Sequence, residues 1–170
     1  MYYLHDKQKK ALERDDYETP EWVWGLFFHY FKNRETRIWA PFYCKGACAP
    51  FIEKYHGTKF IHLERDFFSW QPEQWDCIVD NPPYSCKQKV FERCVALEKP
   101  FALYVPIDTL ERSYIKNLLG SSPHFQIIIP NQRTHFITEY DVLHTCPPHK
   151  TAWFCYKMEL ADGRQLIFQE

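Results

Sequence analysis

Short apolar runs alternate along the chain with segments whose apolar residues recur at helical spacing. The apolar runs predict five strands, at residues 36–42, 59–63, 75–80, 101–105 and 125–129. The helical spacing predicts helices at residues 20–31, 50–55, 86–97 and 110–119, the first of them capped by Thr19 and opened by Pro20. Two last apolar runs, 152–158 and 164–168, bracket Asp162-Gly163, a dipeptide typical of a β-hairpin turn.

Strands that alternate with helices and end in a hairpin predict an α/β fold. We expect a mostly parallel sheet with a C-terminal antiparallel hairpin. The first strands read as continuous apolar runs, which is typical of parallel strands buried on both faces. In such sheets ligands bind beyond the carboxyl ends of the strands, where the strand order reverses. Chemically active residues are therefore expected directly after strands.

The length of 170 residues predicts a single domain over 1–170. Residues 1–16 are polar and mixed in charge, and we interpret them as an arm. Residues 131–150 form the one long stretch without a predicted element. A loop of this length in a small domain is usually functional, and we expect either a lid over the substrate or an interface.

Composition and charge exclude several classes of protein. Apolar residues make up 45% and charged residues 25%, which are ordinary globular values, so a disordered or fibrous chain is excluded. The net charge of −1 excludes a protein that holds nucleic acid mainly by neutralising phosphates, so such a contact is expected to be local or shared with a partner. The N-terminus does not resemble a secretory signal, and no apolar run could cross a bilayer. We therefore expect an intracellular protein, cytoplasmic or nuclear, without membrane contact.

The cysteines do not indicate a metal site. Seven cysteines without framework spacing are typical of reduced thiols. Cys44 and Cys48, and the trio of His144, Cys146 and His149, lack the paired spacing of zinc ligands. No metal is expected.

The segment Asn81-Pro82-Pro83-Tyr84 directly follows the apolar run that ends at Asp80. Proline cannot donate a backbone hydrogen bond and fixes φ near about −65°, so the segment is rigid and its carbonyls are free to accept. Asn81 adds an amide oxygen, and Tyr84 adds a flat aromatic face. Two acceptors beside a stacking surface suit a planar ring with an exocyclic NH2 group, whose hydrogens would reach the Asn81 side chain and the Pro82 carbonyl.

This segment resembles the catalytic motif of S-adenosylmethionine-dependent amino methyltransferases, which methylate adenine N6, cytosine N4 or a protein glutamine amide. The order of a Thr-Pro element, a first loop, an acid-Phe element and Asn-Pro-Pro-Tyr-Ser is similar to the phage-type DNA adenine N6-methyltransferases, over roughly residues 16–154. The resemblance implies a Rossmann-like methyltransferase fold and the cofactor S-adenosyl-L-methionine. It also implies that the substrate is a nucleic acid, either DNA or RNA. The catalytic residues that it implies are Asn81, Pro82, Pro83 and Tyr84.

The same resemblance implies where the cofactor is held. The Thr-Pro element would touch the methionine end of the cofactor, the first loop would follow the first strand, and the acid-Phe element would meet the adenine. Glu64 and Asp66 both lie at a distance from the loop that is typical of a ribose-binding acid, and the choice between them stays open. The predicted cofactor-binding residues are Tyr17, Thr19, Pro20, Pro41, Phe42, Gly46, Glu64, Asp66, Phe67 and Asp80.

The first loop departs from the family pattern. Ala40 stands where the family has an acid, and Gly46 is the one glycine of the loop. This predicts weak cofactor binding, replacement of the acid by Asp80, or loss of binding. We therefore expect methyl transfer to an exocyclic amine, most often adenine N6. The alternatives are an inactive methyltransferase-fold subunit and a protein glutamine N-methyltransferase. Substrate selection is expected to need a partner subunit, a homodimer or a structured RNA.

Overall fold

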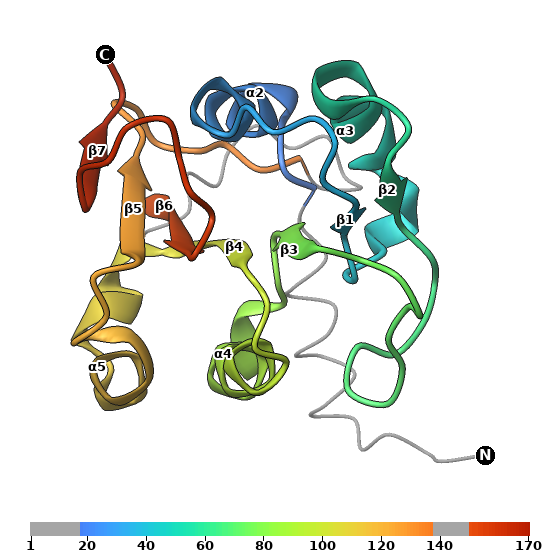
Figure 1. Ribbon diagram of the computed structural model, residues 1–170. Helices are drawn as coiled ribbons and strands as arrows, with labels where there is room; N and C mark the ends of the chain where they lie inside the picture. Colours follow the sequence, from blue (N-terminus) through green and yellow to red (C-terminus); the bar gives the residue numbers. More distant parts are fainter. Residues whose placement is uncertain (1–17, 138–149) are drawn as a thin grey trace.

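A seven-stranded mixed sheet forms the centre of the computed structural model, which describes residues 18–137 and 150–170 (Figure 1). The strand order is β2-β1-β3-β4-β6-β5-β7. β6 runs antiparallel to both of its neighbours, and the other neighbouring strands are parallel. The strands are β1 (Ile38–Trp39), β2 (Phe60–Ile61), β3 (Cys77–Asp80), β4 (Phe101–Pro106), β5 (Phe125–Ile129), β6 (Thr151–Tyr156) and β7 (Leu166–Phe168).

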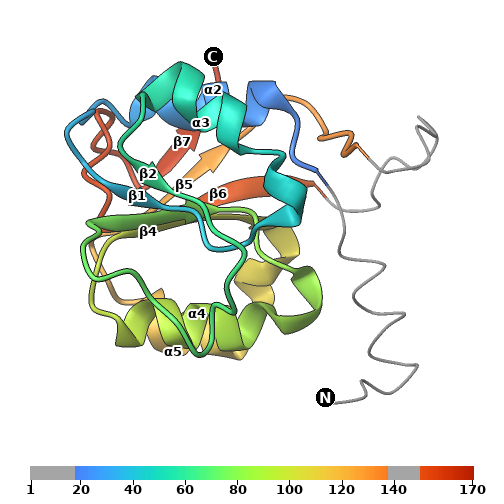
Figure 2. The same cartoon turned by 90° about the vertical axis from the view of Figure 1, so that its right-hand side faces the viewer.

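Helices cover both faces of the sheet, which gives three layers (Figure 2). α2 (Glu21–Tyr30) and α3 (Ala49–His56) lie on one face, and α4 (Lys87–Ala96) and α5 (Ser113–Leu119) lie on the other. Three short 3-10 helices follow strands: η1 (Cys44–Gly46), η2 (Tyr84–Cys86) and η3 (Ile107–Glu111). The prediction of an α/β fold with a mostly parallel sheet is confirmed.

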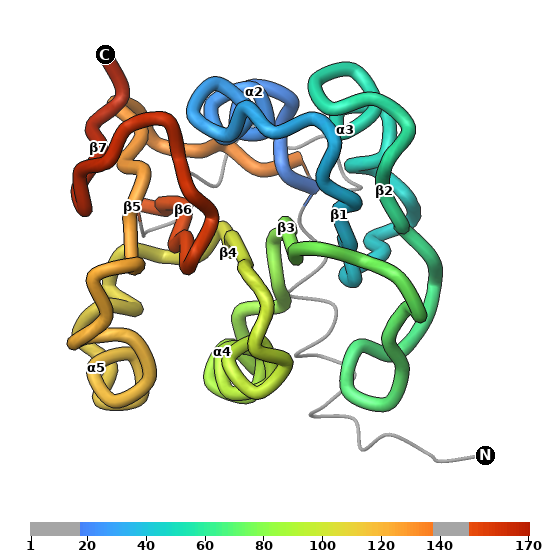
Figure 3. Tube along the Cα trace, in the orientation of Figure 1, coloured from blue at the N-terminus to red at the C-terminus, as the bar shows by residue number. Residues whose placement is uncertain are grey.

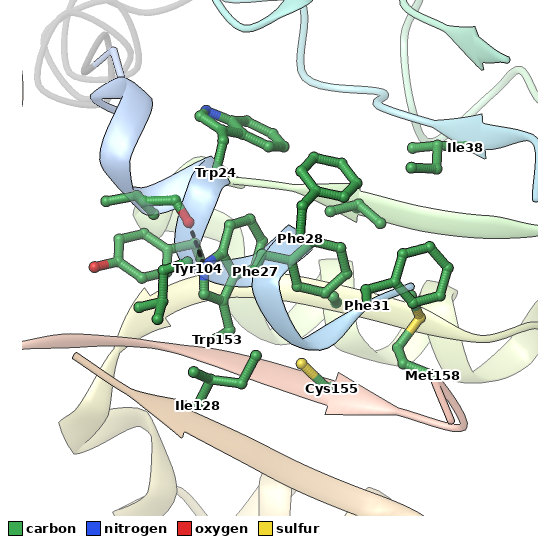
Figure 4. Close-up of a cluster of buried hydrophobic side chains, with 14 of the residues drawn as sticks. Trp24, Phe27, Phe28, Phe31, Ile38, Tyr104, Ile128, Trp153, Cys155 and Met158 are labelled. Carbon is green, nitrogen blue, oxygen red and sulfur yellow. Dashed lines mark hydrogen bonds between the residues drawn. The ribbon is translucent and has the colours of Figure 1, made fainter. Parts of the chain in front are cut away.

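Large aromatic side chains pack together in the core under α2 (Figure 4). The fully buried Trp153 of β6 contacts Trp24, Phe27 and Tyr104, with ring centroids 5.5, 4.9 and 5.0 Å away. Its Nε1 donates a hydrogen bond of 3.1 Å to the carbonyl of Val23. This contact fixes α2 across the middle of the sheet, and so it also fixes the start of α2 near the carboxyl ends of the strands.

The opposite core packs α4 and α5 against the sheet. Val90, Phe91 and Cys94 of α4 are buried together with Ile115 and Leu119 of α5. Their spacing of three and four residues puts one apolar stripe of each helix on the sheet. This core also contains Trp39, Phe67, Trp75, Leu103 and Phe154.

The predicted C-terminal hairpin is wrong. β6 and β7 are not neighbours, because β5 lies between them (Figure 3). After β6 the chain buries Met158 and Leu160 in the α2 core, and Ala161 N bonds to Tyr30 O at 2.9 Å. Gln126 of β5 then donates through Nε2 to the carbonyls of Asp162 and Arg164, at 2.8 and 2.9 Å. Asp162-Gly163 therefore turns the chain to the far side of β5, where β7 runs parallel to it.

Two other local expectations need correction. The helix predicted at residues 110–119 is divided into η3 and α5, with Arg112 in an extended conformation between them. Pro20, and not Thr19, is the N-cap of α2, and no side chain of the described residues caps this helix by a hydrogen bond. The predicted arm at residues 1–16 lies outside the described residues, and of the predicted loop at 131–150 the structure describes 131–137 and 150.

Within residues 18–137 and 150–170, no helix is both long enough and apolar enough to cross a membrane.

Candidate functional site

The carboxyl ends of β1, β2, β3 and β4 lie at one edge of the sheet, since these strands are parallel neighbours. From β1 the chain goes outward to β2 and then returns to form β3 on the other side of β1. The strand order thus reverses between β1 and β3. In parallel α/β sheets this reversal separates the loops that follow the two strands and opens a crevice for ligands. The candidate site is at this position.

Asp80, the last residue of β3, links the two loops that meet here. The residue is only 2% exposed. Oδ2 accepts a hydrogen bond of 2.7 Å from Phe42 N in the loop after β1, and Oδ1 accepts one of 2.8 Å from Asn81 N. Burial raises the pKa of Asp80 to about 8, although the two backbone N–H groups act to lower it. Asp80 is therefore a buried residue that connects the loop after β1 to the segment after β3.

Asn81 presents a buried acceptor at the tip of β3. Its Oδ1 atom is shielded from solvent and accepts no hydrogen bond from the residues that the structure describes. Leaving such an acceptor unsatisfied costs about 1–3 kcal/mol. A ligand with an N–H donor at this point would remove that cost, and unsatisfied buried groups of this kind often mark functional positions.

The two prolines continue the chain in an extended form. Pro82 is buried, and Pro83 is half-buried with φ −57° and ψ 124°. η2 then begins at Tyr84, whose ring is half-buried. This ring meets Phe136 edge-on, with centroids 6.3 Å apart and planes at 78°, and Lys87 Nζ lies 5.8 Å from its centroid.

Phe136 joins the Thr-Pro element to the Asn-Pro-Pro-Tyr segment. The next residue, Ile137, forms an antiparallel bridge with Glu18 through hydrogen bonds of 3.0 and 3.1 Å. Thr19, which follows Glu18, is 7% exposed, and Pro20 is half-buried. Segments that are more than 50 residues apart in sequence thus converge beside Tyr84. The predicted cofactor residue Tyr17 lies outside the described residues.

The segment that carries Phe136 is anchored by buried hydroxyl groups. Thr134 Oγ1 lies 2.5 Å from the hydroxyl of Tyr104 and accepts a hydrogen bond of 3.0 Å from Thr151 Oγ1. Thr151 Oγ1 also lies 2.8 Å from the Tyr104 hydroxyl, so the three groups form a closed triangle. All three residues are at most 4% exposed. The triangle holds residues 131–137 against β4 and β6.

The loop after β1 adopts a backbone that glycine favours, although it contains one glycine. Cys44, Lys45 and Gly46 have φ values of +35°, +56° and +78° in succession. A left-handed conformation costs about 1–2 kcal/mol at a residue with a Cβ atom. Such strain is typical of loops whose shape matters for a ligand.

His62 lies against the loop that follows β1. It follows β2 directly, and its Nδ1 lies 2.8 Å from the carbonyl oxygen of Ala40, to which it donates. Its ring packs on Tyr43 with centroids 5.0 Å apart, and Cys48 Sγ lies 3.5 Å from its Nε2. The Ala40 side chain is fully buried, so this position contributes only its backbone.

The acid-Phe element divides into a core residue and a turn. Phe67 is 4% exposed and packs on Phe42 and Trp39, with ring centroids 5.1 and 5.4 Å away. Asp66 accepts from Phe68 N at 3.1 Å and from Ser69 Oγ at 2.8 Å, so its carboxylate stabilises a local turn. Glu64 is exposed. The structure therefore brings Phe67 to the first loop, while the choice of a ribose-binding acid stays a prediction.

Sequence reasoning missed three residues at this edge: His62, Thr109 and Phe136. Thr109 follows β4, is fully buried, and its Oγ1 has no hydrogen-bond partner among the described residues. None of these residues belongs to a motif. For His62 and Thr109 the only signal is that each closely follows a parallel strand.

No group of three or more His, Cys, Asp or Glu side chains in residues 18–137 and 150–170 is arranged to hold a metal ion. His144, Cys146 and His149 lie outside the described residues.

A hollow of about 490 Å³ lies at the opposite edge of the sheet, where β1, β2 and β3 begin. Several of its charged side chains bind groups within the hollow: Lys59 pairs with Glu35, and Arg37 donates to Gln74 Oε1 at 2.8 Å. Arg37 N also donates to Asp76 Oδ2 at 2.6 Å. These contacts are internal, so the hollow offers less to a ligand than the carboxyl edge does.

Comparison of the chain with protein-family models gives no match, and comparison with curated protein sequences gives no match either. Any functional assignment therefore rests on the motifs and on the geometry of the carboxyl edge.

Proposed function

We propose that this chain transfers a methyl group from S-adenosyl-L-methionine to an exocyclic amine, and that the amine is adenine N6 in DNA or RNA. One observation carries the proposal. The amide oxygen of Asn81 is a buried acceptor without a donor among the described residues, at the tip of β3 and beside the point where the strand order reverses. A planar NH2 group is the kind of donor that this position lacks.

The residues of the segment would act on the amine by position and by hydrogen bonding. Asn81 Oδ1 and the Pro82 carbonyl would each accept one N–H of the amino group. These bonds favour a pyramidal nitrogen, and they stabilise the positive charge that develops as its lone pair attacks. Tyr84 would cover the face of the ring, and base stacking on an aromatic side chain is worth about 1–3 kcal/mol.

The cofactor would lie against the loop after β1. Its chemical contribution is an electrophilic methyl group. Gly46 and the left-handed backbone before it would allow close approach, Phe67 would support the loop from below, and Thr19 would lie at the methionine end. Asp80 is committed to Phe42 N and Asn81 N, so its part is to fix the loop and Asn81 relative to one another.

The strand order of the sheet also supports this proposal. In Rossmann-like nucleotide-binding domains the parallel strands also reverse their order at one point of the sheet. The ligand-binding crevice of such domains lies at the reversal, which is where Asp80 and Asn81 stand. We therefore propose a Rossmann-like methyltransferase domain in which β6 is antiparallel.

A second candidate is a methyltransferase-fold subunit without catalytic activity. Two observations favour it. Ala40 replaces the acid of the family loop and is fully buried, and the Asp66 carboxylate is engaged in its own turn. In this alternative the chain would act as a structural partner of an active subunit.

Labelled methyl transfer tests the proposal and separates the candidates. The chain is incubated with S-adenosyl-L-methionine labelled at the methyl group and with single-stranded DNA, RNA or a glutamine-containing peptide. We expect label in nucleic acid, recovered as N6-methyladenosine or its deoxy form after digestion. Single strands are offered because a base in a duplex must first be flipped out, which costs a few kcal/mol. Label in the peptide alone would assign a protein glutamine methyltransferase. Cofactor binding by calorimetry then separates an enzyme with another substrate from an inactive subunit.

A further inference from the structure

The outer strand of the sheet, β7, has an open edge. It pairs with β5 on one side, and no strand of the described residues lies on its other side (Figure 1). In a parallel ladder alternate residues bond to the neighbouring strand, and here Gln165 O and Gln169 N bond to β5. The same alternation turns the backbone N–H and C=O groups of Leu166 and Phe168 toward the open edge.

This edge is also apolar. Leu166 is 50% and Phe168 59% exposed, whereas Ile167 between them is fully buried. The two exposed side chains lie opposite Ile127 and Ile129 of β5, on the face covered by α4 and α5. Residues 165–169 include no charged residue and no proline, which are the usual devices that protect an open edge.

We propose that β7 pairs antiparallel with β7 of a second copy of this chain, about a two-fold axis through Ile167. In this register Leu166 lies opposite Phe168 of the second copy. Both residues turn their backbone groups outward, so Leu166 and Phe168 of the second copy form a hydrogen-bonded pair. Ile167 lies opposite Ile167 of the second copy, and these two residues form a non-hydrogen-bonded pair. The two seven-stranded sheets become one continuous sheet.

Charge complementarity selects this register. Arg164 lies opposite Glu170 of the second copy, and the two-fold axis makes this contact twice. Arg164 also bonds to Asp162 of its own chain, and its five N–H donors can serve both carboxylates. An axis through Leu166 would instead place Glu170 opposite Asp162, which puts two acids together. An axis through Phe168 would place Glu170 opposite Leu166.

Sedimentation equilibrium of the full chain over a range of concentrations tests the pairing. We expect a reversible dimer. Leu166→Lys or Phe168→Lys should raise its dissociation constant at least about tenfold, because each change acts twice in the interface. Leu63→Lys is the matched control, since Leu63 has the same 50% exposure as Leu166 and should leave the dimer unchanged. A chain that is monomeric at every concentration, or a dimer that both β7 variants leave intact, overturns the proposal.

Charge reversal at two exposed side chains gives a second test of the dimer. Arg164→Glu and Glu170→Arg should each weaken the dimer, because each places like charges opposite one another. The double variant should restore most of the parent affinity. A double variant that is weaker than both single variants contradicts the proposed contact.

Cysteine cross-linking tests the register. Hydrogen-bonded antiparallel pairs have Cα atoms about 5.5 Å apart, which suits a disulfide. A mixture of Leu166→Cys and Phe168→Cys chains should therefore form a heterodimer on mild oxidation, while each variant alone should cross-link no more than the parent. Efficient cross-linking of Leu166→Cys with itself contradicts an axis through Ile167. The inference stands apart from methyl transfer, because none of these positions belongs to the candidate site.

Discussion

Asp80→Asn tests whether burial raises the pKa of the Asp80 carboxyl as far as its surroundings indicate. Asp80 is 2% exposed, its carboxyl oxygens accept hydrogen bonds from two backbone N–H groups, and no cationic side chain of the described residues lowers its pKa. Burial disfavours the charged form, and it raises the pKa to about 8. In the unfolded chain an Asp has a pKa of about 3.9. Between these two values the folded chain keeps a proton that the unfolded chain releases.

The sign of the pH dependence follows from this proton. Because the unfolded chain binds fewer protons than the folded chain over this range, a rise in pH favours unfolding. The contribution amounts to about 1.4 kcal/mol per pH unit, and so to about 2.7 kcal/mol between pH 5 and pH 7. Asn cannot ionise, so the variant lacks this contribution at every pH.

The assay is urea denaturation of the parent and of Asp80→Asn at pH 5, 6, 7 and 8. The free energy of unfolding of the parent, minus that of the variant, should fall steadily with pH and level off above about pH 8. The matched control is Asp76→Asn, because the exposed Asp76 also accepts a backbone N–H, from Arg37. The fall with pH that is expected for the buried Asp80 is compared with the result for this exposed residue. A parent–variant difference for Asp80 that is constant from pH 5 to pH 8 would refute the reasoning.

Substitutions at three further positions test separate parts of the account. Tyr84→Phe should keep most of the activity and Tyr84→Ala should lose about tenfold or more, because stacking needs the ring; equal losses in steady-state turnover would assign the role to the hydroxyl. Glu98→Gly should raise the free energy of unfolding in urea by about 1 kcal/mol, since Glu98 follows α4 with φ +57°; a decrease would contradict this. Trp153→Phe should lower it by about 2–4 kcal/mol, because it removes buried volume and the bond to Val23; a loss below 1 kcal/mol would contradict the packing.

The predicted strands and the position of the Asn-Pro-Pro-Tyr segment depend on local signals. Continuous apolar runs such as 101–105 and 125–129 identify strands that are buried on both faces, and the structure confirms each of them. The run that ends at Asp80 is β3, so Asn81 stands at a strand tip as its sequence position predicts. These features are readable because each depends on residues that are adjacent in the chain.

The features that were wrong or missed depend on contacts between distant residues. Asp162-Gly163 has the chemistry of a hairpin turn, yet burial of Met158 and Leu160 under α2 carries the chain past β5. The local chemistry of this dipeptide is compatible with two outcomes, and the packing of the rest of the molecule selects one.

His62, Thr109 and Phe136 were missed for a similar reason. Each reaches the carboxyl edge of the sheet only after the strands are ordered, and strand order is not encoded in any one segment. Phe136 depends further on the hydroxyl triangle of Tyr104, Thr134 and Thr151, whose members come from three separate segments.

The central claim is that Asn81 binds the reacting amine, and one comparison tests it most directly. Turnover and cofactor affinity are measured side by side for the parent, Asn81→Ala and the control Asn117→Ala, which changes an exposed residue of α5. Turnover comes from labelled methyl transfer to single-stranded nucleic acid, and affinity for S-adenosyl-L-methionine comes from calorimetry.

The account predicts that Asn81→Ala lowers turnover by about 10²-fold or more, the usual scale for removal of one preorganised polar contact. Cofactor affinity should stay close to that of the parent, because Asn81 would contact the substrate amine, and Asn117→Ala should change neither quantity. An Asn81→Ala chain that turns over at the parent rate would contradict the catalytic role of the segment.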